Sequence, residues 1–296
     1  MLKGLCAYPL TPFAQGRPDE ASFGRLVDRL RRARVDSICV LGSTGNFAYM
    51  DRQERRRIAQ LAVEAADGIP VIVGISALAA RQVLALAEDA QQAGAGALML
   101  SPMSYQILRD HEVFELFRAV NDASSLPLVI YDNPSTTHFS CSDDLLGRLA
   151  GLSRVGAIKI PAVPLQSQQA QERVGRLRAL LPADVSLGVS GDASAVVGLS
   201  AGCDAWCSVL GGLFPQDALA ICKVAQAGGG QQAQALADRW QGLWDLNARY
   251  GSLRVVATAA ELIGLAGPSC LPAPLQVLDE PGQAELKAVL VRLGLY

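Results

Sequence analysis

The alternation of short apolar segments with helical patterns predicts an α/β fold, a TIM (β/α)8 barrel with a C-terminal helical domain. Eight apolar segments occur within residues 1–227, and a helical pattern follows each of them. The segments are apolar throughout and do not alternate, which is typical of strands buried on both faces. A doubly wound sheet shares this alternation, so the count of eight is what favours the barrel.

The expected strands are four to seven residues long and are bounded by turn-forming residues. In chain order they are residues 5–10, 37–41, 69–75, 97–100, 128–131, 155–161, 186–190 and 205–209.

The expected helices have apolar residues three and four positions apart and several begin at a capping side chain. Asp19 is such a cap, and Phe23, Leu26, Val27 and Leu30 after it share one helix face. The helices expected between the strands and after the last one are residues 19–33, 51–66, 77–93, 110–122, 142–149, 165–181, 193–201 and 215–226.

The three glycines at positions 228–230 mark the expected domain boundary. Residues 1–227 form the predicted barrel, and residues 228–296 form the C-terminal helical domain. Only helical patterns follow the glycines, at residues 231–247, 253–265 and 282–293.

Composition excludes several classes of protein. The net charge is −2 and no basic field suggests nucleic acid. No apolar stretch reaches the length of a membrane-spanning helix, so we expect no membrane partner. Seven scattered cysteines without a Cys-x-x-Cys pair indicate a reducing, cytoplasmic location. With His111 and His138 as the only histidines, we expect no metal site.

Lys159 is the candidate catalytic residue, because it is the single charged residue of an apolar strand. Burial disfavours an ammonium and lowers its pKa, and a neutral amine is a nucleophile. Such an amine attacks the carbonyl of a 2-oxo acid to form a Schiff base. The alternative is a lysine at the end of a strand with its amine in water.

Active sites of these barrels lie at the C-terminal ends of the strands, which gives the other candidates. Ser43 and Thr44 follow the second strand in a Gly-Ser-Thr-Gly turn, whose N–H groups and hydroxyls suit a carboxylate. Tyr131 ends the fifth strand, where a phenol can transfer protons or simply fill the core. Gly191 allows a close approach of backbone to ligand, and Cys207 lines the eighth strand.

Five motifs occur in an order and spacing that resemble one family over nearly the whole chain. They are Pro-Leu-Thr-Pro-Phe at 9–13, Gly-Ser-Thr-Gly at 42–45, Tyr-Asp-Asn-Pro at 131–134, Ile-Lys at 158–159 and Ser-Gly-Asp at 190–192. The chain resembles the dihydrodipicolinate synthase and N-acetylneuraminate lyase family. Family members are barrels with a helical C-terminal domain, commonly homotetramers, and form an imine with pyruvate or another 2-oxo acid without any cofactor. The resemblance implies a homotetramer or homodimer for this chain.

The resemblance also implies roles. Lys159 resembles the imine-forming lysine, Tyr131 the proton-transferring tyrosine, and Ser43 a member of the proton relay. Ser43 and Thr44 resemble the carboxylate-binding hydroxyl residues, and Gly191 the glycine beside the substrate.

Two further positions depart from the family pattern. Tyr105 resembles a tyrosine that crosses a subunit interface, although its segment carries one residue more than usual. Thr136 stands where dihydrodipicolinate synthases have an arginine that binds the carboxylate of aspartate semialdehyde.

The favoured function is therefore a Schiff-base lyase acting on pyruvate or another small 2-oxo acid, dihydrodipicolinate synthase-like. Because Thr136 stands in place of the arginine, a 2-keto-3-deoxy sugar acid aldolase or dehydratase is an alternative function. A catalytically silent 2-oxo-acid-binding barrel is an alternative of another class. So is a phosphate-binding barrel, for which Gly211-Gly212 is the only sign.

Overall fold

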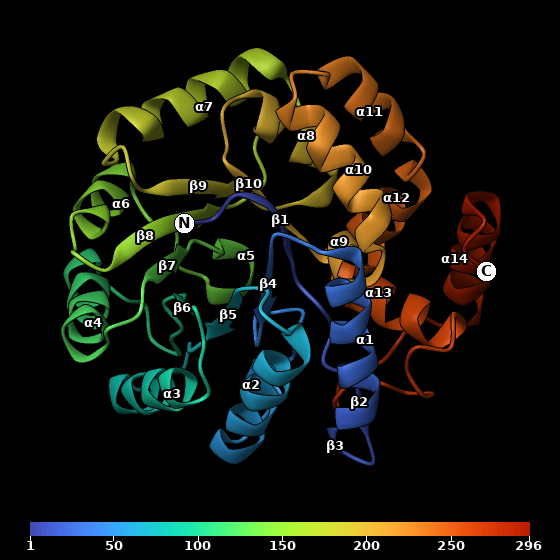
Figure 1. Ribbon diagram of the computed structural model, residues 1–296, viewed down its shortest axis with the longest axis horizontal. Coiled ribbons are helices and arrows are strands. Elements are labelled where there is room, and N and C mark those ends of the chain that lie inside the picture. The colour runs from blue at the N-terminus through green and yellow to red at the C-terminus, as the bar shows by residue number, and fades with distance from the viewer.

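The computed structural model describes residues 1–296, and its eight parallel strands close into a barrel (Figure 1). Around the barrel the strands follow the order β1-β10-β9-β8-β7-β6-β5-β4. They are β1 (Gly4–Ala7), β4 (Ser37–Val40), β5 (Val71–Gly74), β6 (Ala97–Leu100), β7 (Leu128–Tyr131), β8 (Val155–Ile160), β9 (Ser186–Val189) and β10 (Ala205–Ser208). The predicted barrel is confirmed, with strand ends shifted by up to three residues.

Helices surround the barrel, and most of them begin near the residues at which the sequence predicted a helix start. The Asp19 side chain accepts a hydrogen bond from the Ser22 N–H, and Asp51 forms a capping box with Glu54. The outer helices are α1 (Glu20–Ala33), α2 (Arg52–Ala66), α3 (Ala80–Gln92), α4 (Asp110–Ala123), α6 (Asp143–Ala150), α7 (Ser167–Leu180), α8 (Ala195–Ser200) and α10 (Pro215–Gln226).

Several short elements were not expected from the sequence. β2 (Phe13–Ala14) and β3 (Arg17–Pro18) form a hairpin whose turn, Gln15-Gly16, has positive φ at both residues. The others are η1 (Phe47–Tyr49), α5 (Pro134–Thr137), η2 (Asp192–Ser194) and α9 (Val209–Leu213). They lie at the ends of strands, where they shape the candidate site.

The C-terminal segment contains α11 (Gly230–Asp238), α12 (Gln241–Tyr250), α13 (Ser252–Leu262) and α14 (Glu280–Leu293). The single helix expected at 231–247 is two helices, a correction to the sequence interpretation. The chain turns at Trp240, whose buried ring lies 5.3 Å from the Phe214 ring between centroids. This contact joins residues far apart in the chain, so local periodicity does not report it.

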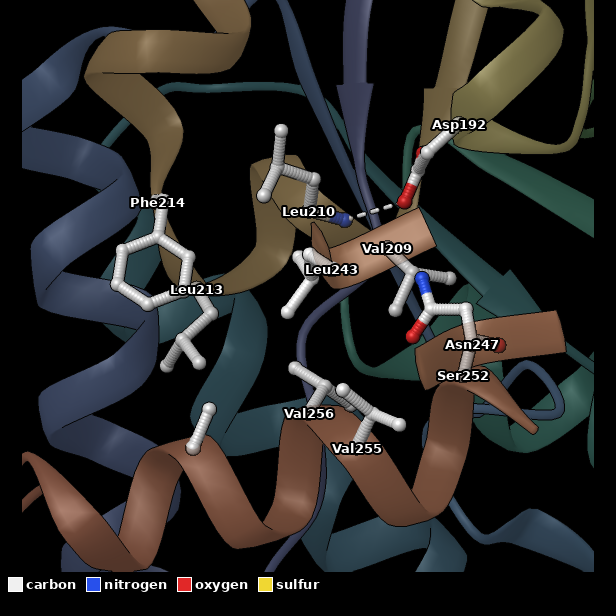
Figure 2. A pocket seen from close by; sticks show the side chains of 11 residues that line it. Asp192, Val209, Leu210, Leu213, Phe214, Leu243, Asn247, Ser252, Val255 and Val256 are labelled. Carbon is white, nitrogen blue, oxygen red and sulfur yellow. Dashed lines mark hydrogen bonds between the residues drawn. The ribbon is translucent and has the colours of Figure 1, made fainter. Parts of the chain in front are cut away.

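α13 packs against α9 at the C-terminal end of the barrel, and α12 packs against α13 and η2 (Figure 2). Leu243, Val255 and Val256 of these helices face Leu210 and Leu213 of α9 across a small apolar gap. Burial of these side chains holds the C-terminal helices beside the ends of β9 and β10. The domain boundary expected at residues 227 and 228 stays a prediction.

Side chains form two buried layers. One lies between the strands and the helices, and the other fills the inside of the barrel with residues such as Leu2, Tyr8, Met99 and Tyr131. No helix is both long enough and apolar enough to cross a membrane.

Candidate active site

A cavity of about 670 Å³ opens at the C-terminal ends of the strands. Its size suits a small organic substrate. Seven of the eight residues proposed from the sequence line it: Lys159, Tyr131, Ser43, Thr44, Gly191, Cys207 and Thr136. The rule that places barrel active sites at strand ends therefore identified residues that are far apart in the sequence and line one cavity.

Lys159 lies deep in this cavity and is 5% exposed. It pairs in register with Tyr131 of β7 and Gly188 of β9. Its Nζ atom lies 3.8 Å from the centroid of the Tyr131 ring and 3.8 Å from that of the Tyr8 ring. Two aromatic faces thus stabilise the ammonium form by cation–π attraction while water is excluded.

The pKa of Lys159 is raised, opposite to the direction expected from the sequence. Burial is the largest influence and lowers this pKa, but the charges of Tyr131, Cys207 and Cys39 raise it by more in sum. The expectation counted desolvation alone, because the sequence does not show which acidic groups surround the amine.

The turn after β4 carries Ser43 and Thr44, and it begins at a residue with an unusual backbone conformation. Leu41 has a φ of 56°, and the Gly45 N–H donates to the Gly42 carbonyl at 2.9 Å. A Cβ at Gly45 would lie 2.8 Å from the Leu41 nitrogen, so a larger residue does not fit. Strain of this kind gathers at functional sites, and here it presents two hydroxyls to the cavity.

Asn133 connects Ser43 to the short helix α5. Its Nδ2 donates to Ser43 Oγ at 3.3 Å and also to the Thr136 hydroxyl, while its Oδ1 accepts from Ser135 Oγ at 2.9 Å. Pro134 at the first helical position is the local sequence signal for α5 that the interpretation missed. The result is a neutral, hydroxyl-rich rim above Tyr131.

Gly191 and Asp192 form the opposite rim. Gly191 has a φ of 82°, and a Cβ there would lie 2.7 Å from Ala162 Cβ. The Asp192 carboxylate accepts hydrogen bonds from Trp206 Nε1 at 3.0 Å, Ser208 Oγ at 3.0 Å and the Leu210 N–H at 2.8 Å, the last drawn in Figure 2. Burial raises the Asp192 pKa, and these hydrogen bonds oppose the shift.

Comparison with known proteins identifies this architecture. The model of the dihydrodipicolinate synthetase family matches residues 1–293. The chain belongs to this family. It is accordingly a Schiff-base lyase of the dihydrodipicolinate synthase type.

The names of individual similar proteins agree with this family assignment. Proteins named 4-hydroxy-tetrahydrodipicolinate synthase from Persephonella marina and Hyphomonas neptunium are each 30% identical over 298 residues, covering 100% of this chain and 99% of theirs. The crystal structure of dihydrodipicolinate synthase from Agrobacterium tumefaciens is 41% identical with a TM-score of 0.95, covering 99% of this chain and 98% of that one. A structure described as the first monomeric dihydrodipicolinate synthase variant is 24% identical with a TM-score of 0.90, covering 100% and 98%, which shows the same fold.

Tyr105 is the one proposed site residue that the structure does not bring to the cavity. It is 92% exposed in the loop after β6, and the nearby Ile107 is 97% exposed. The role suggested for Tyr105, to reach across a subunit interface, stays a prediction.

The sequence interpretation also missed several residues of the lyase's cavity. Tyr8 directly follows β1, so the strand-end rule could have found it. Trp244, Asn247 and Ser252 come from α12 and α13, where no local pattern indicated a site.

The Gly211-Gly212 pair, the only sign of a phosphate-binding barrel, has a packing role instead. Both glycines are buried in α9, and a Cβ at Gly212 would lie 2.2 Å from the Tyr8 carbonyl oxygen. Their backbone is therefore not open to a phosphate group.

Proposed function

We propose that Lys159 forms an imine with the keto group of pyruvate or a related 2-oxo acid. The observation that carries the proposal is the position of Lys159, 5% exposed and within 3.8 Å of two tyrosine ring centroids, in the cavity that Ser43 and Thr44 line. A buried amine beside hydroxyls for a carboxylate supports covalent catalysis.

Because its pKa is raised, Lys159 rests as an ammonium and loses a proton before it attacks. Tyr131 has its ring centroid 3.8 Å from the amine and its side chain hydrogen-bonds to Lys159, so we assign it the proton transfer, and Ser43 continues the path. Attack on the ketone and loss of water then give a protonated imine. This imine accepts electrons when a proton alpha to it, or a carbon–carbon bond beta to it, breaks.

Ser43 and Thr44 are proposed to bind the carboxylate of the 2-oxo acid. Their hydroxyls and the backbone N–H groups of the turn are hydrogen-bond donors. Cys207 and Gly191 line the cavity near the same place. An uncharged donor set of this kind holds a carboxylate beside the lysine without competing with Tyr131 for its proton.

The activity named in the relatives, 4-hydroxy-tetrahydrodipicolinate synthase, is the first candidate for the overall reaction. Aspartate semialdehyde brings a second carboxylate, and no arginine lines the cavity. Thr136 offers a neutral hydroxyl where dihydrodipicolinate synthases have a guanidinium.

The second candidate is a 2-keto-3-deoxy sugar acid aldolase or dehydratase. It is favoured by the neutral polar side chains around the cavity, which include Asn133, Ser135, Thr136, Asn247 and Ser252. Hydroxyl and amide groups suit a hydroxylated chain better than they suit an anion.

Trapping with borohydride and mass spectrometry across a panel of 2-oxo acids would test the proposal. We expect covalent attachment of pyruvate or a 2-keto-3-deoxy sugar acid, followed by turnover in an aldehyde-release or semialdehyde-coupled assay. Attachment without turnover of any partner would instead favour the silent binding barrel.

We further propose a cytoplasmic homotetramer or homodimer. Seven free cysteines suit a reducing compartment, and the exposed Tyr105 and Ile107 suit a contact between subunits. Sedimentation of the purified chain tests the assembly, and a single monomeric species at micromolar concentration would contradict it.

A further inference from the structure

Three of the seven cysteines, Cys6, Cys39 and Cys207, lie inside the barrel, and two of them, Cys39 and Cys207, act electrostatically on Lys159. The Cys39 thiol contacts Met99 Sδ at 3.6 Å, and the Tyr8 hydroxyl contacts the same sulfur at 3.4 Å. The other four thiols belong to the separate buried cluster outside the barrel interior. The interior group is therefore a distinct cluster of thiols next to the reactive amine.

Cys207 is the one cysteine that lines the cavity. Gly188, the register partner of Lys159, lies beneath it, and a Cβ at Gly188 would be 3.0 Å from Cys207 Sγ. The missing side chain lets the sulfur occupy the space above the strand next to Lys159. Small molecules that enter the cavity can reach this sulfur.

The electrostatic surroundings separate Cys207 from the other thiols. Hydrogen bonding from Cys6 lowers the pKa of Cys207, burial opposes this, and the charge of Lys159 lowers it further. By contrast, burial raises the pKa of Cys39, of Cys203 and of Cys222 to about 12. Thiolate character is what makes a cysteine reactive.

Cys6 is placed to react with an oxidised Cys207. The two residues are register partners on the adjacent strands β1 and β10, and both side chains point into the barrel. Neighbouring strands lie roughly 4.8 Å apart. That separation is within the range of Cα distances, about 4.4–6.8 Å, that a disulfide spans.

We propose that Cys207 and Cys6 form a reversible oxidation site inside the active cavity. The Cys207 thiolate attacks a peroxide, the O–O bond breaks, and the products are a sulfenic acid and hydroxide or alkoxide. The Cys6 thiol then displaces water from this sulfenic acid, which leaves a Cys6–Cys207 disulfide. Two electrons pass from the thiols to the peroxide, and a dithiol returns them.

Oxidation at this place changes the surroundings of Lys159. The disulfide removes a charge that raises the lysine's pKa and draws a cavity-lining sulfur towards β1. A transient bond of this kind is compatible with a reducing compartment, where cysteine oxidation serves sensing.

Two measurements test the site by mass, independently of any activity. In the native protein, limiting iodoacetamide should label Cys207 before the other six thiols. After brief hydrogen peroxide treatment, digestion without reductant should yield a cross-linked peptide pair containing Cys6 and Cys207, which dithiothreitol separates.

Cys6→Ser should give oxygen-bearing Cys207 and no cross-link, whereas the control Cys222→Ser, which alters a buried thiol outside the barrel interior, should behave as the wild type. Labelling of another cysteine first, a cross-link between other cysteines, or seven unmodified thiols after peroxide would overturn the proposal. None of these results depends on which 2-oxo acid the lyase uses.

Discussion

At the scale of single residues, the position of Lys159 follows from the sequence but its protonation does not. A lone lysine in an apolar strand predicts burial, and the side chain is 5% exposed. Its raised pKa depends on Tyr131, Cys39 and Cys207, which three other strands contribute. Only the closed barrel shows that these groups face the same amine.

The raised pKa predicts how imine formation depends on pH. Below the pKa of Lys159 the neutral amine fraction grows about tenfold per pH unit. The rate of trapping by pyruvate and borohydride should therefore rise from about pH 7 towards pH 10, measured at low pyruvate concentration so that imine formation limits the rate. A rate that stays constant over this range would show that the amine is already neutral at pH 7.

Tyr131→Phe removes the phenol next to Lys159 and keeps the ring. Turnover should fall by about 10²–10⁴-fold, the usual contribution of a general acid–base group, with little change in pyruvate binding. Tyr49→Phe is the matched control, because Tyr49 is a surface residue that does not line the cavity. Near-normal kcat in Tyr131→Phe would assign Tyr131 a packing role only.

Thr136→Arg tests the choice of the second substrate. A guanidinium adds a charge-assisted pair of hydrogen bonds worth roughly 1.5–3 kcal/mol, against about 1 for a neutral hydroxyl. We expect kcat/KM for aspartate semialdehyde to rise about tenfold, while the use of 2-keto-3-deoxy sugar acids falls. The control is Ser135→Arg, which places the same charge at the neighbouring exposed position. Equal gains in both variants would mean that charge alone, and not the place of Thr136, matters.

At the scale of elements, predictions succeeded where a cap or a periodic face determines the structure. The Asp19 side chain accepts a hydrogen bond at the helix start it was expected to cap, and Asp51 and Ser142 do the same at the starts of two further expected helices. The failures are α5, α9 and the division at Trp240, where tertiary contacts decide. Five residues or fewer make up each of α5 and α9, too few for helical periodicity to register.

Gly212→Ala tests the packing of α9 on the end of β1. The new Cβ would lie 2.2 Å from a backbone oxygen, so α9 must move, and overpacking of this kind costs about 1–3 kcal/mol. Gly24→Ala in α1 meets no atom within 4 Å and should stabilise by about 0.5–1 kcal/mol. Urea unfolding measures both changes, and an unchanged midpoint in Gly212→Ala would contradict the tight contact.

At the scale of the whole molecule, the count of eight strand–helix units was enough to predict the barrel and the end at which the cavity opens. The C-terminal contribution to the cavity was not predictable. Asn247 and Ser252 reach it because α12 and α13 bury apolar residues against α9 (Figure 2). Such contacts join residues far apart in the chain and leave no local pattern.

Covalent attachment of the 2-oxo acid at Lys159 is the central step of the proposed function, and one measurement tests it directly. The chain contains four lysines, and Lys3, Lys223 and Lys287 are exposed, so peptide mapping after pyruvate and borohydride treatment distinguishes them. We expect the added mass on the peptide that contains Lys159, and none in Lys159→Ala. The same label on an exposed lysine, or labelling that persists in Lys159→Ala, would contradict the account.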